Sequence, residues 1–92
     1  MAEKDFIVGN VTSVLDGETF QVSVDRIGKR NLQVYGDTER IHMKKLKLRE
    51  NVWMTGVFTK PQLERMFRGK KVLCRVSSRD LSGRIVADVQ VM

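Results

Sequence analysis

Hydrophobic and polar residues alternate over several short stretches of this chain, as in β-strands that bury one face. Apolar residues at Phe6, Val8, Val11 and Val14 predict a strand over Phe6–Leu15. Gly9 within it indicates a bulge or a close approach of another backbone. From Thr19 to Val24 the alternation is strict, and Asp16-Gly17 before it predicts a tight turn between two strands.

Three further stretches show the same period. After a turn at Gly28, Leu32 and Val34 alternate with polar residues up to Gly36 and predict a third strand. Lys71–Val76 predicts a fourth strand and Arg84–Val91 a fifth, with turns at 77–80 and at Ser82-Gly83 between them.

The middle of the chain is less regular. Residues 37–55 have no clean period, and Leu46 and Leu48 among cationic residues fit either a short basic edge strand or a loop. Thr59-Lys60-Pro61-Gln62 then has the pattern of a capping box with proline in the first turn, so a helix of about ten residues should end at Gly69.

Three strands, one helix and two more strands follow the order of a five-stranded OB-type Greek-key barrel, with the helix between strands 3 and 4. We therefore expect a mainly β protein in which residues 1–92 form a single domain. An open sheet with the helix packed across it is the alternative architecture.

Composition excludes several classes of protein. The 92 residues contain one cysteine, Cys74, and one histidine, His42, so neither a disulfide framework nor a zinc site of cysteines and histidines is expected. The start of the chain is charged and lacks the apolar run of a secretory signal, and no apolar stretch is long enough to span a bilayer. We expect a cytoplasmic protein with no membrane partner.

Positive charge is concentrated in the middle of the sequence. The whole chain carries a net charge of +6, whereas residues 26–79 hold fifteen basic and four acidic residues, a net charge of +11. Such a distribution favours a polyanionic partner, and phosphate is the most common anion of that kind. A cationic cluster could follow a chain of phosphates, although a solvated loop fits equally well; it consists of Arg40, Lys44, Lys45, Lys47 and Arg49.

Three motifs in sequence order resemble the staphylococcal-nuclease-like family. Val14–Phe20 resembles its strand–turn–strand signature, in which Asp-Gly-Asp-Thr is usual, and Leu32–Gly36 resembles its third strand, typically Val-Arg-Leu-x-Gly. Gly69–Val72 and Asp80–Ala87 resemble its later block, Gly-Lys-x-Val followed by Asp-x-Tyr-Gly-Arg. The resemblance covers nearly the whole chain from Phe6 to Val91 and implies the barrel of that family without the helices that follow it.

The resemblance implies a phosphodiesterase site that is incomplete in this chain. The family uses two aspartates and a carbonyl to bind Ca²⁺, a glutamate base and two arginines. Arg84 matches one arginine, Glu18 stands at one metal-ligand position, and Gln33 replaces the other arginine. Asp37 and Glu39 match the second ligand and the base only if a proline is deleted from the family pattern Asp-x-Pro-Glu, and no alignment restores the whole set.

We therefore expect a domain that binds single-stranded DNA or RNA, needs no cofactor for binding, and has lost or impaired hydrolysis. The expected binding residues are Gln33, Tyr35, Arg40, Lys44, Lys45, Lys47, Arg49, Lys70, Lys71 and Arg84. Tyr35 is expected to be an exposed stacking platform, whereas Trp53 and Phe58 are expected to pack in a core under the helix. An active Ca²⁺-dependent endonuclease, with Glu18 and Asp37 as ligands and Glu39 and Arg84 as catalytic residues, is one alternative. A protein-interaction scaffold is another.

Overall fold

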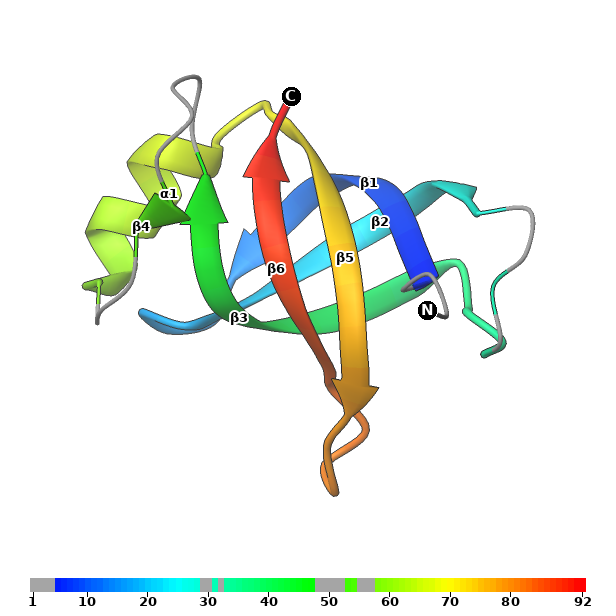
Figure 1. Ribbon diagram of the computed structural model, residues 1–92. Helices are drawn as coiled ribbons and strands as arrows, with labels where there is room; N and C mark the ends of the chain where they lie inside the picture. Colours follow the sequence, from blue (N-terminus) through cyan, green and yellow to red (C-terminus); the bar gives the residue numbers. More distant parts are fainter. Residues whose placement is uncertain (1–4, 29–30, 32, 48–52, 55–57) are drawn as a thin grey trace.

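The computed structural model describes residues 5–28, 31, 33–47, 53–54 and 58–92. Within them the element order is β1 (Asp5–Val14), β2 (Thr19–Ile27), β3 (Thr38–Lys47), β4 (Trp53–Met54), α1 (Lys60–Phe67), β5 (Lys71–Arg79) and β6 (Ile85–Val91). The fold is mainly β, as expected (Figure 1). Helix α1 is too short to cross a membrane, and no other helix that could do so occurs in these ranges.

Five of the strands close into a barrel. β1 pairs antiparallel with β2 and with β5, β2 pairs antiparallel with β3, and β5 pairs antiparallel with β6. The parallel pair of β3 and β6 completes the circle, and the two residues of β4 extend β3 outside it. Closure leaves few strand edges unpaired, which suits a small domain that has no second layer to cover them. The alternative of an open sheet is therefore wrong.

The barrel interior is filled by the apolar residues of each alternating strand. Phe20 of β2 and Phe67 of α1 lie with ring centroids 4.7 Å apart, so the helix packs directly on the core. Cys74 is fully buried as a small apolar residue, and burial raises the pKa of its thiol to about 12. The fully buried side chains include Ile7, Phe20, Val22, Ile41, Leu46, Leu63, Phe67, Val72, Ile85 and Val89.

The helix begins and ends at the predicted signals. The Thr59 hydroxyl accepts a hydrogen bond from the Gln62 N–H, and the Gln62 side chain accepts one from the Thr59 N–H, which completes the capping box. Gly69 follows with a φ of 67°, the left-handed conformation that ends helices. The predicted bulge at Gly9 is also confirmed, because the register of β1 against β2 shifts between Val8 and Gly9.

The predicted third strand at 32–36 is wrong: residues 33–36 lie outside the strands, and β3 occupies 38–47 instead. The reason is that two backbone N–H groups of this segment bond to carboxylates. The N–H of Gln33 donates to the Asp5 carboxylate and the N–H of Gly36 to that of Glu39, so neither joins a ladder. The predicted turn at 77–80 also starts later, since β5 continues to Arg79 after a register shift between Val76 and Ser78.

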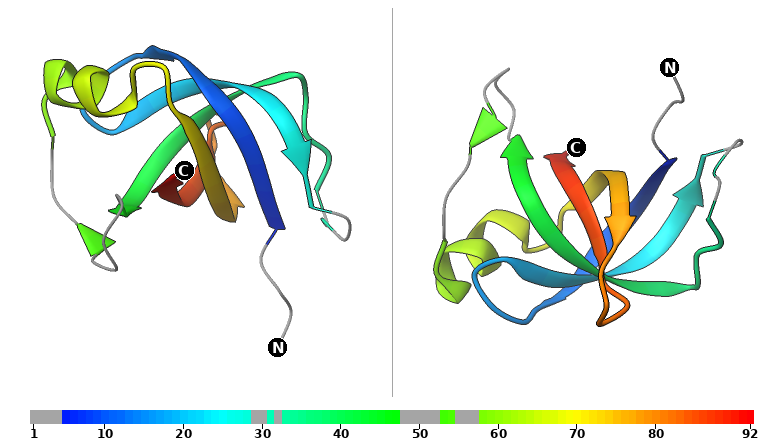
Figure 2. Two further views of the ribbon diagram at one scale, coloured as in Figure 1. Left: turned by 90° about the horizontal axis from the view of Figure 1, so that it is seen from above. Right: turned by 60° about the horizontal axis from the view of Figure 1, so that its bottom comes forward.

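Helix α1 and the segment between β2 and β3 lie at opposite ends of the barrel (Figure 2). At the helix end, Gly17 of the β1–β2 turn packs on the backbone of Phe58, where a side chain at residue 17 would collide with the Phe58 carbonyl. At the other end, Tyr35 packs against the core and its hydroxyl donates to Asp5 over 2.9 Å. The outer face of β3 runs between these two ends.

Candidate nucleic-acid interface

The outer surface of β3 is lined with basic residues. Ile41, Met43 and Leu46 point into the core, so the residues between them face outward. A register shift against β6 between Met43 and Lys45 inserts one extra residue, and both Lys44 and Lys45 are exposed. We call the resulting set the β3 cation row: Arg40, Lys44, Lys45 and Lys47.

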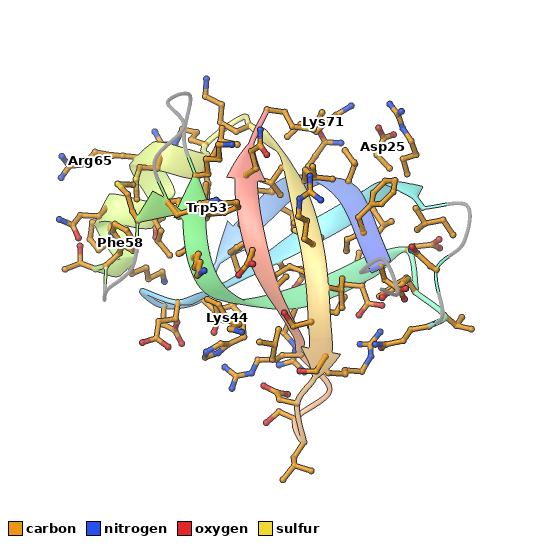
Figure 3. The ribbon with its side chains drawn as sticks, viewed as in Figure 1. Asp25, Lys44, Trp53, Phe58, Arg65 and Lys71 are labelled. Atoms are coloured by element: carbon orange, nitrogen blue, oxygen red, sulfur yellow. The ribbon has the colours of Figure 1, made fainter. Side chains whose placement is uncertain are left out.

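Most of these charges have no acidic partner in the described part of the chain. Arg40, Lys44 and Lys45 form no ion pair among the described residues, whereas Lys60, Lys71, Arg79 and Arg84 are each paired with a carboxylate. The ammonium group of Lys47 lies 5.6 Å from the centroid of the Trp53 ring. In Figure 3, Lys44 lies beside β3 and Trp53 on β4, whereas Lys71 lies beside Asp25 on the other side of the barrel. The cation row is therefore available for an anionic ligand.

Two turns flank one end of the cation row. In the β1–β2 turn the Asp16 carboxylate accepts the N–H groups of Glu18 and Thr19, each over 2.8 Å. The Glu18 N–H bond is the largest cause of a lowered Asp16 pKa; burial opposes it, while hydrogen bonds from Thr19 and the charge of Arg84 lower the pKa further. A carboxylate held ionised in this way keeps the turn in a fixed shape.

The β5–β6 turn is held by a second carboxylate. Asp80 accepts the N–H groups of Ser82 and Arg84 and also pairs with the Arg84 guanidinium over 2.8 Å. Burial raises the pKa of Asp80, but the backbone and side-chain hydrogen bonds from Arg84 outweigh it and lower that pKa overall. Arg84 also donates to the Thr19 hydroxyl over 3.1 Å, so it joins the two turns.

Arg84 and Arg40 are neighbours on the outer surface. Ile41 and Ile85 are paired in the parallel ladder of β3 and β6, and both are fully buried. The residues that precede them, Arg40 and Arg84, therefore face outward side by side, with Gln21 of β2 paired to Arg40 on the other side. Arg84 extends the row toward the turns, although Asp80 neutralises part of its charge.

Glu18 lies in the same region as Arg84. Its carboxylate is 3.5 Å from Nε2 of His42, the residue paired with Thr19 across β2 and β3. The other ring nitrogen of His42, Nδ1, is buried and has no hydrogen-bond partner among the described residues. Glu18, His42 and Arg84 thus converge around Thr19.

The other predicted catalytic and metal-binding residues lie elsewhere. The Asp37 carbonyl accepts a hydrogen bond from the Val24 N–H, whereas the Glu18 carbonyl accepts one from the N–H of Met43, about 20 Å further along an extended strand. Glu39 is paired with Arg79 over 3.1 Å, and its side chain is 12% exposed. Within the described ranges, no group of three or more histidine, cysteine, aspartate and glutamate residues could hold a metal ion.

The remaining predicted binding residues lie outside the β3 cation row or outside the described residues. Gln33 and Lys70 are exposed but lie away from β3 along the chain, and Lys71 is paired with Asp25 over 2.9 Å. Tyr35 is not the exposed platform expected from the sequence: it is half-buried, bonded to Asp5, and covered by the guanidinium of Arg79 at 5.6 Å from its ring centroid. Arg49 lies outside the described residues.

The sequence interpretation missed two residues. Arg79 was assigned to a turn, yet it donates to Glu39, to the Val34 carbonyl and to the Gly83 carbonyl. Trp53 was expected in the core with Phe58; Phe58 does pack against the core, but Trp53 is 38% exposed. A tryptophan next to a run of lysines is a signal that could have suggested this exposure.

Comparison of the chain with family models, with curated proteins and with solved structures gave no significant match.

Proposed function

We propose that this protein is an OB-type domain that binds single-stranded nucleic acid on the outer face of β3 and does not cleave it. The observation that carries the proposal is the β3 cation row, in which Arg40, Lys44 and Lys45 have no ion-pair partner among the described residues. Affinity for nucleic acids comes largely from lysine and arginine contacts to phosphates.

The connectivity of the barrel supports this choice of face. The pairing circle β1–β2–β3–β6–β5 has the strand order of an OB-type Greek-key barrel once the short β4 is set aside. OB folds bind oligonucleotides on the face of their second and third strands, between the loops that join strands 1 to 2 and 4 to 5. Here those loops are the turns held by Asp16 and Asp80, and the strand between them carries the cation row.

The position of β3 also revises the proposed resemblance to staphylococcal-nuclease-like proteins. Gln33 is not on a strand, so its match to a family arginine loses its basis. If the pattern Val-Arg-Leu-x-Gly is placed on β3 it falls on residues 41–45, which puts His42 at the arginine. In an ungapped alignment the aspartate of Asp-x-Pro-Glu stands two residues after the glycine of the strand pattern, which puts Lys47 at the aspartate. Glu50, at the glutamate, lies outside the described residues.

This placement favours binding over hydrolysis. A lysine at a metal-ligand position repels a divalent cation. In the other alignment, where Glu39 is the base, its carboxylate is engaged with Arg79 rather than free to activate water. The sites expected for Ca²⁺ at Glu18 and Asp37 stand about 20 Å apart along the β2–β3 pair. The proposal therefore requires no Ca²⁺.

Fluorescence anisotropy of a labelled single-stranded oligonucleotide, with DNA and RNA of one sequence, tests the proposal. For three to four phosphate contacts, the logarithm of the affinity should fall with the logarithm of the salt concentration with a slope of about −2 to −3. The triple variant Arg40→Gln, Lys44→Gln, Lys45→Gln should reduce that slope to near zero.

The matched control is Arg26→Gln, Arg65→Gln, Arg68→Gln, which removes the same charge from exposed residues outside β3. Equal loss of binding in both triple variants would show attraction to net charge alone and would overturn the proposed face. Cleavage of the oligonucleotide that depends on Ca²⁺ would favour the endonuclease instead. A protein partner retained after nuclease treatment and at high salt, without oligonucleotide binding, would favour the scaffold.

A further inference from the structure

One aromatic side chain stands out on the surface beside the cation row. Trp53 is 38% exposed on β4, where it pairs with Lys47 at the end of β3. An exposed aromatic ring beside a row of cations is the combination with which proteins bind single-stranded nucleic acid, because the cations follow the phosphates and the ring stacks on a base.

The other aromatic residues are not available in the same way. Phe20 and Phe67 are fully buried, Phe58 packs against the core, and Tyr35 is covered by Arg79. Phe6 is 37% exposed, but it lies on β1, which pairs with β2 and β5 and not with β3. Trp53 is therefore the exposed ring of the described residues that adjoins the cation row.

Lys47 belongs to the cation row and also contacts the Trp53 ring. Lys47 and Trp53 are cross-strand partners, and the ammonium lies over the ring at 5.6 Å from its centroid. A cation on one face leaves the exposed remainder of the ring for another planar group. A nucleotide whose phosphate binds Lys47 would place its base within reach of this ring.

We infer that Trp53 stacks on an unpaired base of the nucleic acid whose phosphates follow the β3 cation row. This inference rests on the proposed function and gives the physical reason for its preference for single strands: the bases of a duplex are already stacked on one another and cannot stack on Trp53. Base stacking on an aromatic ring accepts any of the bases, so the site discriminates strandedness and not sequence.

Trp53 is the single tryptophan of the chain, so intrinsic fluorescence reports on this position alone. Three probes of equal length are used: a single-stranded oligonucleotide, its duplex, and an abasic oligonucleotide with the same phosphates. The single strand should quench the fluorescence strongly, whereas the abasic strand and the duplex should bind with little quenching.

Trp53→Ala should weaken binding of the single strand about 5- to 150-fold, the range that alanine substitution gives for one stacked base. The same variant should leave the affinity for the abasic strand within about twofold. Trp53→Phe keeps an aromatic face and should retain most of the affinity. Circular dichroism of both variants controls for folding.

The two proposals fail in different ways. If the labelled single strand binds with the expected salt dependence but Trp53→Ala binds it as tightly as the parent chain, the stacking role is overturned and the phosphate-binding role stands. Equal quenching by the abasic strand would overturn the stacking role in the same way. If no probe binds at low salt, both are overturned.

Discussion

Two groups of charges in this barrel are arranged in opposite ways. At the end away from the helix, Glu39 and Arg79 are paired over 3.1 Å, Tyr35 donates to Asp5, and Gln33 and Gly36 donate backbone N–H groups to the same carboxylates. On the outer face of β3, basic residues follow one another without a described acidic partner. Paired charges fix the shape of the barrel, whereas unpaired charges are available to a ligand.

The comparison teaches that the number of charges does not identify the binding surface. Lys71 and Arg79 contribute to the positive charge of the sequence as much as Lys44 and Lys45 do, but each has a partner within the fold. An exposed ion pair contributes little to stability, while a half-buried one is costly to break because the remaining charge loses its partner. We therefore expect mutation of the paired charges to lower the stability of the fold, and mutation of the β3 cation row to leave it nearly unchanged.

The largest expected effect follows from removal of Arg79. Arg79→Ala leaves Glu39 unpaired, with its side chain 12% exposed, and leaves the carbonyls of Val34 and Gly83 without this donor. We expect the free energy of unfolding to fall by about 3 kcal/mol. Urea denaturation at neutral pH measures it, with Arg40→Ala as the matched control, for which we expect a change below about 0.5 kcal/mol. Equal losses of stability in the two variants would mean that the paired and the unpaired charges contribute alike to the fold.

A pH-dependent effect of intermediate size is expected at Glu39. Burial raises its pKa, but hydrogen bonds from Arg79 and the Gly36 N–H, with the charge of Arg79, lower it below the ordinary value of 4.5 overall. Because the folded pKa is the lower one, Glu39 stabilises the fold above the unfolded pKa. That stabilisation is lost as the pH falls through the folded pKa.

The difference in the free energy of unfolding between the parent chain and Glu39→Gln isolates this contribution, because the other acidic residues are the same in both. At pH near 7 we expect the parent chain to be more stable by about 1–2 kcal/mol, from hydrogen bonds to a charged group. This difference in the free energy of unfolding should narrow as the pH falls below about 4. Urea midpoints at several pH values give the measurement, and a gap independent of pH would show that Glu39 acts through packing alone.

Much of the barrel could be predicted from the sequence, because several elements are specified by neighbouring residues. The alternation in Thr19–Val24 and the capping box at Thr59 are local signals, and both predict the observed elements. β3 was missed for a local reason too: the extra residue between Met43 and Lys45 shifts the alternation, so Leu46 follows Met43 by three positions instead of two.

The site was less predictable because its geometry depends on contacts between distant residues. The proximity of Glu18 and Arg84 followed from a motif comparison, and both lie beside Thr19. The roles of Arg79 and Tyr35 depend on Glu39 and Asp5, which are 40 and 30 residues away in sequence. No periodicity in a single sequence identifies such pairs, so Tyr35 was expected to be exposed and Arg79 to lie in a turn.

The smallest expected effect concerns the stability of the cation row itself. Lys44 and Lys45 are adjacent, exposed like charges, so removal of one relieves repulsion and breaks no described ion pair. We expect Lys45→Gln to change the free energy of unfolding by less than about 0.5 kcal/mol, in the stabilising direction at low salt. The difference should disappear at about 1 M salt, where the Debye length is only about 3 Å. Urea denaturation at both salt concentrations measures it. A clear destabilisation would mean that this lysine supports the fold. The charge would then not be available to a ligand, and the contrast between the two regions would weaken.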